Sequence, residues 1–154
     1  MSCALYHANA LQQCRVDAER ARSLKLAWVG TLIDAWGDML ESRGSPEAFC
    51  SAAETTFLFP PDLDAWFYSV LGLSHFGGPR GEELAIKTLA FLVGRGFVPY
   101  HTFLRHTWLD PLRDRTEFIE ILEQAKKRHR ESQTAFLQAG GEALLGTGAA
   151  GSPV

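Results

Sequence analysis

Residues 63–95 read LDAWFYSVLGLSHFGGPRGEELAIKTLAFLVGR, and they carry the strongest structural signals of the chain. The first part of this stretch places apolar residues, among them Trp66, at helical spacing. A Gly-Gly-Pro sequence at residues 77–79 is typical of a turn. The second part is apolar nearly all round, as in a helix that is buried on several sides. The stretch therefore predicts two antiparallel helices, over residues 63–75 and 82–95.

The sequence before this stretch predicts further helices. Residues 5–41 contain no proline and are rich in Ala, Leu, Arg and Glu. We expect one or two helices there, the second after a break near residues 22–23, because apolar side chains recur every three or four positions. Gly44 is expected to stop this segment. The periodic residues are Val29, Leu32, Trp36 and Met39.

A separate helix is expected between this segment and the central stretch. Ser45 is a suitable N-cap, and Pro46 suits the first helical position. The helix should run to about Leu58, where Pro60-Pro61 ends it. Asp62 is then placed to cap the helix that follows.

The C-terminal part predicts two short helical pieces and one long helix. The short pieces lie near residues 101–105 and 110–113. The long helix, over residues 115–139, starts at Asp114-Arg115-Thr116-Glu117, a D-x-x-E variant of the capping box, and ends at Gly140-Gly141. Its predicted buried stripe contains Phe118, Leu122, Ala125, His129, Ser132 and Phe136.

The whole sequence predicts an all-α domain of short antiparallel helix pairs, because no strand–helix alternation is present. A length of 154 residues fits one domain, over residues 1–146, with a glycine-rich flexible tail over 147–154. Within the domain we expect N-terminal helices over residues 1–44, central helical units over 45–97 and a C-terminal cap over 98–146.

Composition excludes several classes of protein. Hydrophobic residues make up 46% of the chain and the net charge is −3, so no general attraction to nucleic acid or to anionic membranes is expected. Cys3, Cys14 and Cys50 form no CxxC pair, which indicates thiols in a reducing compartment. No signal peptide and no apolar run of about 18 residues is visible, so the expected location is cytoplasmic.

Two motifs of the central stretch resemble a tetratricopeptide repeat. They are DAWFY at residues 64–68 and ELAI at residues 83–86. Such repeats are helix–turn–helix units of about 34 residues that stack into a solenoid. The turn at residues 77–81 is about three residues longer than in that repeat.

The following region is similar to the C-terminal cap of tetratricopeptide arrays in bacterial signalling proteins. Those proteins include Ser/Thr kinases, adenylate cyclase-type regulators and winged-helix transcription regulators. The similar segments are RGF at residues 95–97, WLDPLR at residues 108–113, Phe118, Leu122 and AGGEALLG at residues 139–146.

The resemblance implies a right-handed α-solenoid with a long C-terminal capping helix. It also implies a non-catalytic scaffold or adaptor that binds a protein or peptide partner. The alternative is a detached C-terminal regulatory region of a larger signalling enzyme or transcription regulator. We expect no enzyme activity and no cofactor, because the sequence has no Gly-rich phosphate loop, no HRD or DFG triplet and no GxSxG elbow. The sequence does not indicate an oligomeric state.

The resemblance also assigns residues to a groove and to the core. In tetratricopeptide stacks the first helix of each unit lines the concave face, which makes Asp64, Phe67, Leu71, Ser74 and His75 peptide-groove candidates. Packing of Phe67 and Leu71 against the preceding helix pair is the favoured alternative. Trp66 is expected to lock its helix, and Trp108 to dock the cap beneath the last helix. The full structural set is Trp66, Trp108, Leu109, Pro111, Leu112, Phe118 and Leu122.

The remaining polar clusters have simpler interpretations. A metal site at His101, His106 and Asp110 is disfavoured because residues five positions apart on a helix diverge. His129 is expected to be half-buried with a hydrogen-bond partner. The basic run at residues 126–130 is expected to be solvated and paired with acids at helical spacing, namely Glu120, Glu123 and Glu131.

Overall fold

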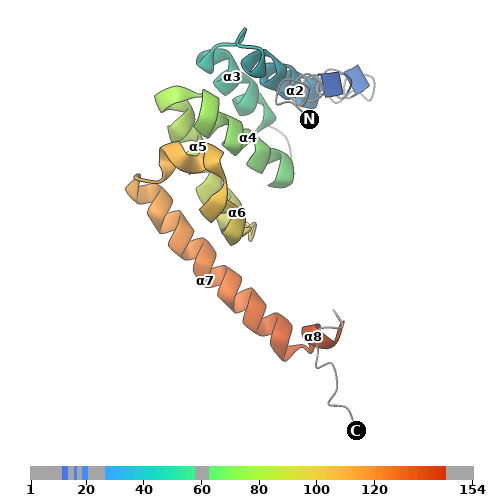
Figure 1. Cartoon of the computed structure of the whole chain (residues 1–154), viewed down its shortest axis with the longest axis vertical. Helices are drawn as coiled ribbons and strands as arrows, with labels where there is room; N and C mark the ends of the chain where they lie inside the picture. The colour runs from blue at the N-terminus through green and yellow to red at the C-terminus, as the bar shows by residue number, and fades with distance from the viewer. Residues whose placement is uncertain (1–11, 14–15, 17–18, 21–26, 58–62, 145–154) are drawn as a thin grey trace, which may run out of the picture.

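The computed structural model describes residues 12–13, 16, 19–20, 27–57 and 63–144, and it is helical throughout (Figure 1). No strand occurs in these ranges, which confirms the all-α prediction for them. The elements are α2 (Ala27–Leu40), α3 (Pro46–Thr56), α4 (Leu63–Phe76), α5 (Gly78–Gly94), α6 (Tyr100–Arg105), the 3₁₀ helix η1 (Thr107–Leu112), α7 (Thr116–Gln138) and α8 (Gly141–Leu144). None of the helices in the described ranges combines the length and the apolar character that a membrane crossing requires.

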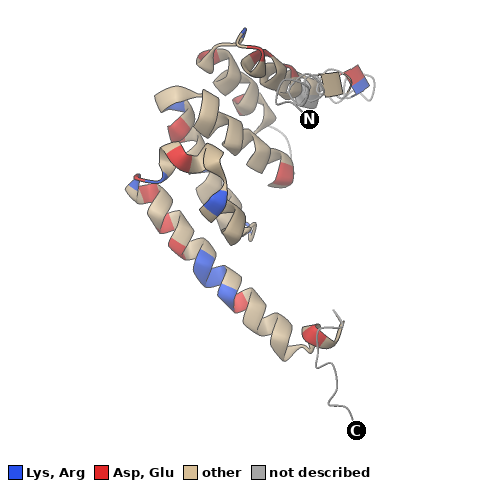
Figure 2. Ribbon diagram, in the orientation of Figure 1, with Lys and Arg blue, Asp and Glu red and all other residues tan. Residues whose placement is uncertain are grey.

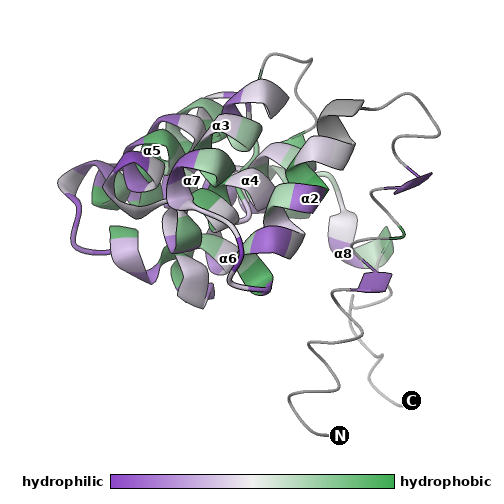
Figure 3. Ribbon diagram, turned by 90° about the horizontal axis from the view of Figure 1, so that it is seen from above, coloured by the Kyte–Doolittle hydropathy of each residue, from purple (hydrophilic) through white to green (hydrophobic). Residues whose placement is uncertain are grey.

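The helices pack as successive pairs. Helix α2 packs against α3, α4 packs most extensively against α5, and α3 contacts both α4 and α5. Helix α6 and η1 follow; η1 lies against α4, and α6 lies against α7. Helix α7 starts beneath α5 and then runs away from the bundle, with α8 at its far end (Figure 1). Hydrophilic and hydrophobic residues alternate along the helices, as amphipathic helices around a shared core require (Figure 3).

The start of α3 agrees with the sequence prediction. The Ser45 side chain accepts a hydrogen bond from the Ala48 backbone N–H at 3.2 Å, and Pro46 is the first helical residue. The cap fixes where the second helix of the first pair begins. Helix α3 ends at Thr56, two residues before the expected end, and the predicted Pro60-Pro61 stop and Asp62 cap lie outside the described residues.

The predicted stop of α2 at Gly44 is wrong. The helix ends at Leu40, and Ser42 adopts the left-handed conformation with a φ of 57°. The backbone N–H groups of Arg43 and Gly44 both donate to the Asp38 carbonyl, at 2.8 and 3.0 Å. Glycine is needed at position 44 for a close contact, because a Cβ there would lie 2.7 Å from the Met39 sulfur.

The turn between α4 and α5 is shorter than predicted. Helix α5 begins at Gly78 with a φ of +57°, so only Gly77 separates the two helices. The expected start near Glu82 was wrong because the glycines that read as a turn form the first turn of the helix. They permit close contact: a Cβ on Gly77 would lie 2.5 Å from the Gly81 Cα, and one on Gly81 would lie 2.4 Å from the Leu73 carbonyl oxygen.

The predicted capping box of α7 is absent. Arg115 occupies the N-cap position and makes no side-chain capping bond, so the helix begins at Thr116. The Glu117 carboxylate accepts a hydrogen bond from its own backbone N–H, and this bond, together with Arg115, lowers the pKa of Glu117. In a capping box, Glu117 would accept from the backbone N–H of the residue that caps the helix. In the structure it accepts from its own backbone N–H within the first turn instead.

The first half of α7 packs against the core. Phe118, Ile121 and Ala125 are buried against it, and Leu122 is partly buried. The Arg128 guanidinium donates hydrogen bonds to the Val93 and Gly94 carbonyls at the end of α5. The Val93 carbonyl also accepts from the Gly96 backbone N–H at 3.0 Å, so the Arg128 contact adds to this turn and ties α7 to the end of α5.

The second half of α7 does not cover the core. Residues 131–140 are all exposed, and the expected inner position of Phe136 is wrong because its side chain is 42% exposed. Phe136 instead lies over Gly141, where an added Cβ would come within 2.3 Å of the ring. The part of α7 that packs against the rest of the fold therefore ends near residue 130, about one helical turn after Ala125.

Most of the expected structural residues lie in the core. Trp66, Leu109, Leu112 and Phe118 are buried, whereas Pro111 is exposed. The Trp66 ring lies between the Phe57 and Phe91 rings, with centroids 4.9 and 5.1 Å away. The largest fully buried side chains include Phe49, Phe103, Phe118, Leu73, Leu89, Leu92, Leu109 and Leu112.

Cys50 is fully buried, and its thiol donates to the Gly77 carbonyl at 3.7 Å. Burial raises the pKa of the Cys50 thiol above the ordinary value of 9.0, and Arg80 offsets part of this effect. As the pH rises, the Cys50 thiol therefore loses its proton at a lower pH in the unfolded chain than in the folded one. The contribution of Cys50 to the free energy of unfolding is constant below about pH 9 and falls as the pH rises further.

We expect Cys50 to react slowly with a thiol reagent in the folded protein and rapidly in denaturant. Mass spectrometry of the Cys50 peptide after timed alkylation measures the two rates. Equal rates in buffer and in denaturant would contradict the buried environment of this thiol.

Candidate functional site

The structure divides the predicted groove residues into two groups. Phe67, Leu71 and Ser74 are buried, so their expected position on a groove is wrong. Asp64 and His75 are exposed at opposite ends of α4. A groove built along the whole of α4 is therefore not present.

The segment after α5 covers this face of α4. The Phe67 ring lies 5.5 Å from the Phe97 ring and 5.4 Å from the Phe103 ring. The aromatic neighbours of Phe67 thus come from the following segment rather than from the preceding helix pair. The buried Ser74 hydroxyl has no hydrogen-bond partner among the described residues.

A partly exposed cluster of rings lies at the end of α4. We call it the aromatic surface, and its members are Trp36 of α2, His75 and Phe76 of α4, His106, and Trp108 of η1. The Trp108 ring stacks on the Trp36 ring with centroids 5.1 Å apart and on the His75 ring at 4.9 Å, where the two planes differ by only 3°. Three elements far apart in sequence therefore meet at one place.

The predicted position of Trp108 beneath the last helix is wrong. Its ring neighbours belong to α2 and α4, and the side chain is half-buried. The Trp36 ring in turn meets the Phe49 ring edge-on at 5.5 Å and the Phe76 ring at 5.7 Å. Trp108 therefore joins the η1 segment to the first two helix pairs.

Local hydrogen bonds fix the orientation of η1. The His106 Nδ1 accepts a hydrogen bond from the Trp108 backbone N–H at 3.3 Å. The Arg113 side chain donates to the Asp110 carboxylate at 2.6 Å and to the His106 carbonyl at 3.2 Å. These bonds hold the 3₁₀ segment in place, so Trp108 is presented from a fixed backbone.

Gly72 brings α2 and α3 close to α4 behind the aromatic surface. A Cβ at this position would lie 2.2 Å from the Phe49 ring and 2.8 Å from the Trp36 ring. A side chain here would displace Trp36 and, through it, the stack with Trp108. The arrangement of the rings in the aromatic surface therefore depends on the absence of a side chain at Gly72.

A shallow open hollow of about 390 Å³ lies beside the aromatic surface. We call it the cationic hollow; it is lined by His101, Thr102, Arg105 and His106. His101 and His106 thus line one hollow, although the sequence interpretation had them diverging, and the His101 ring also meets the His129 ring of α7 at 5.0 Å. Asp110 is absent from the lining, and no cluster of three metal-ligating side chains occurs in the described part of the chain.

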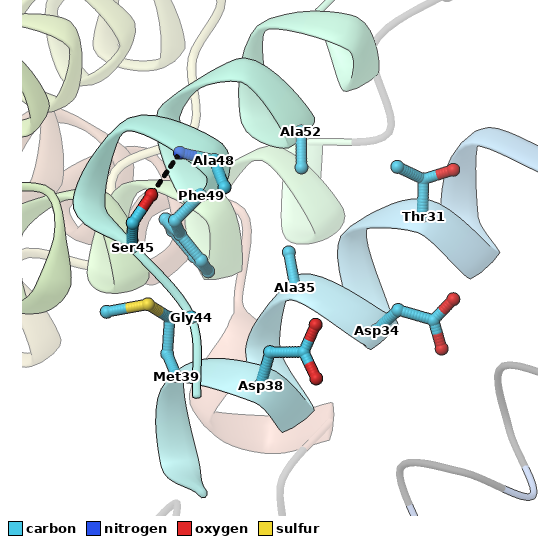
Figure 4. A pocket seen from close by; sticks show the side chains of 10 residues that line it. All are labelled: Thr31, Asp34, Ala35, Asp38, Met39, Gly44, Ser45, Ala48, Phe49 and Ala52. Atoms are coloured by element: carbon cyan, nitrogen blue, oxygen red, sulfur yellow. Dashed lines mark hydrogen bonds between the residues drawn. The ribbon is translucent and has the colours of Figure 1, made fainter. Parts of the chain in front are cut away.

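A second pocket, of about 260 Å³, lies between α2 and α3 (Figure 4). Asp34 and Asp38 stand on its α2 side, and the Ser45–Ala48 cap lies on its α3 side. The apolar part of the lining is Ala35, Met39, Phe49 and Ala52. The charge of this pocket is opposite to that of the cationic hollow.

The basic run on α7 is partly neutralised by contacts within the fold. Lys126 pairs with Glu123 at 3.2 Å, and Arg128 binds the end of α5. Acidic residues precede the basic band along α7 (Figure 2). The half-buried His129 lies against the His101 and Tyr100 rings, with centroids 5.0 and 6.0 Å away.

Flat rings that are half exposed offer apolar contact and stacking, and an adjacent guanidinium offers charged hydrogen bonds. The sequence interpretation missed Trp36 as a site residue because its helical spacing assigned it to the core. No signal in the sequence places Trp36 against Trp108, 72 positions later.

Comparisons of the chain with protein-family models, with curated proteins and with solved structures find no significant match.

Trp108→Ala tests the stack directly. We expect a loss of about 2 kcal/mol in the free energy of unfolding, less than the 3–5 kcal/mol typical of a fully buried aromatic residue, because the ring is only half-buried. Urea unfolding followed by circular dichroism measures the loss. An unchanged midpoint would show that Trp108 makes no stabilising contact with α2 and α4.

Proposed function

We propose that this chain is a non-catalytic interaction module of tetratricopeptide type that binds a peptide segment of a protein partner. The single observation that carries the proposal is the aromatic surface, to which α2, α4 and η1 each contribute a ring. Partner-binding surfaces are enriched in Trp and other aromatic residues, which give large contact area at a low cost in conformational entropy.

The spacing of the helices supports the tetratricopeptide type. The second helices of successive pairs begin at residues 46, 78 and 116. These steps are close to the period of about 34 residues in tetratricopeptide repeats. The first half of α7 also packs against α5 of the preceding pair, and covering the apolar face of the preceding unit is the task of a terminal helix in a solenoid.

A role as an adaptor in bacterial signalling follows from the resemblance of residues 95–146 to the caps of such proteins. The partner would then be a regulatory protein that offers an extended or helical segment to the aromatic surface. Aromatic contacts would supply most of the affinity, and the polar rim would supply orientation.

Selection of displayed random peptides against the purified chain tests the proposal. Peptides that bind wild type should bind Trp108→Ala and His75→Ala at least about tenfold more weakly, because a central aromatic contact contributes 2 kcal/mol or more. Tyr68→Ala is the matched control, since Tyr68 lies on α4 as His75 does and is 62% exposed, with no part in the aromatic surface.

Binding that tolerates Trp108→Ala, or a selection that yields no specific peptide, would overturn the proposal. Circular dichroism of each variant separates lost binding from lost folding. Quenching or enhancement of tryptophan fluorescence on binding gives an independent readout, because Trp36 and Trp108 both lie at the surface.

A further inference from the structure

We infer that the bound segment is acidic: it places an Asp or Glu carboxylate in the cationic hollow and an apolar or aromatic side chain on Trp108 and His75. This inference rests on the proposed function and adds the chemistry of the partner. It follows from the charges around the hollow and from the continuity of the hollow with the aromatic surface.

Arg105 provides an available guanidinium. It is exposed, it lines the cationic hollow, and it forms no ion pair within the described residues. An Arg side chain presents donors in a planar fork that matches a carboxylate. Other arginines near this end of the fold are already engaged: Arg113 binds Asp110, Arg115 pairs with Glu82 and Glu117, and Arg128 binds the end of α5.

The lining of the hollow contains no carboxylate. Besides Arg105 it offers two imidazoles and the Thr102 hydroxyl, all of which can donate hydrogen bonds. The acid nearest in sequence, Asp110, is held by Arg113 at 2.6 Å and does not line the hollow. An incoming carboxylate therefore meets donors and no fixed negative charge.

His106 connects the two parts of the site. Its ring lines the cationic hollow and also meets the Trp108 ring edge-on, with centroids 5.9 Å apart. An extended peptide advances about 3.3 Å per residue, so side chains two positions apart are about 6.6 Å apart, close to the 5.9 Å that separates the His106 and Trp108 rings. The recognition element is thus a carboxylate and an apolar side chain on the same side of an extended segment.

The pocket between α2 and α3 would favour the opposite partner charge. Asp34 and Asp38 line it, and its lining contains no Lys or Arg; Arg43, which pairs with Asp38 and Glu41, is not among the lining residues. An acidic segment is therefore directed to the cationic hollow rather than to the deeper-set pocket of Figure 4.

The test uses peptides selected on the full chain from a random library. For each selected peptide, a matched version replaces every Glu with Gln and every Asp with Asn. Titration calorimetry then measures both versions on wild type, on Arg105→Gln and on the control Arg95→Gln. Arg95 is an exposed cation above the Phe91 ring of α5, 5.3 Å from its centroid, and lies outside the hollow.

We expect the amide version to bind wild type and Arg95→Gln about tenfold more weakly than the acidic version, and Arg105→Gln to bind both versions alike. The preference should weaken in high salt. Two results would overturn the inference and leave the proposed function standing. In the first, the peptides need Trp108 but bind equally well in their acidic and amide versions. In the second, Arg105→Gln still binds the acidic version more tightly. Peptides that bind Trp108→Ala as well as wild type would overturn both.

Discussion

A chain that stops after Arg113 is expected to lose its cooperative fold and to aggregate. The truncation removes Phe118, Ile121 and Ala125 from the core and uncovers the apolar helix α5. It also removes Arg128, which donates to the Val93 and Gly94 carbonyls and ties α7 to the end of α5. Loss of one buried Phe alone costs about 3–5 kcal/mol, against a total stability of about 5–15 kcal/mol for a typical domain.

A stop after Arg130 is the matched control. Because residues 131–140 are all exposed, this shorter deletion should leave the melting temperature within about 2 °C of wild type. A stop after Gly146 should have no effect either, as the sequence predicts for the tail. Size-exclusion chromatography and thermal melts compare the three products. A monomeric, fully helical product from the Arg113 stop would show that α7 is an appendage and not a cap.

Phe49→Ala is expected to lower the free energy of unfolding by about 3–5 kcal/mol. Phe49 is buried and connects three elements: it projects from α3, meets Trp36 of α2 edge-on at 5.5 Å and meets Phe76 of α4 at 5.9 Å. Its ring also lies directly over Gly72 of α4, so its removal leaves a cavity between α3 and α4.

Urea unfolding monitored by circular dichroism measures this loss. Tyr68→Ala is again the control, and it should change the stability by no more than about 0.5 kcal/mol because the side chain is largely exposed. A loss below that of Trp108→Ala would contradict the central position of Phe49. Since Phe49 supports Trp36, peptide affinity should fall in this variant even where it remains folded.

Local signals in the sequence predicted the elements that depend on local chemistry. Ser45 and Pro46 start α3 because a hydroxyl cap and a proline at the first position act within one turn. The periodicity around Trp66 predicted α4, and the apolar residues that follow predicted the buried α5. The first half of α7 was predicted because Phe118, Leu122 and Ala125 are spaced for one face.

Features that depend on tertiary contact were not predictable in the same way. The glycines at the start of α5 indicate a turn in isolation, but Gly78 and Gly81 belong to the helix, where Gly81 lies close against the Leu73 carbonyl of α4. Phe136 has the right period for a core position, yet its ring lies over Gly141 of the short helix α8 rather than against the core. Trp108 was assigned to α7 because sequence spacing cannot show that η1 crosses to α2 and α4.

The most direct test of the binding surface is to map where a selected peptide lies. A peptide that carries a benzophenone side chain is irradiated on the folded chain, and the attached residues are found by mass spectrometry. Binding at the aromatic surface predicts attachment to α2, α4, α6 and η1, near Trp36, His75 and Trp108, and loss of attachment in Trp108→Ala. Attachment to the outer faces of α3 and α5, unchanged by Trp108→Ala, would contradict an interaction surface at this site.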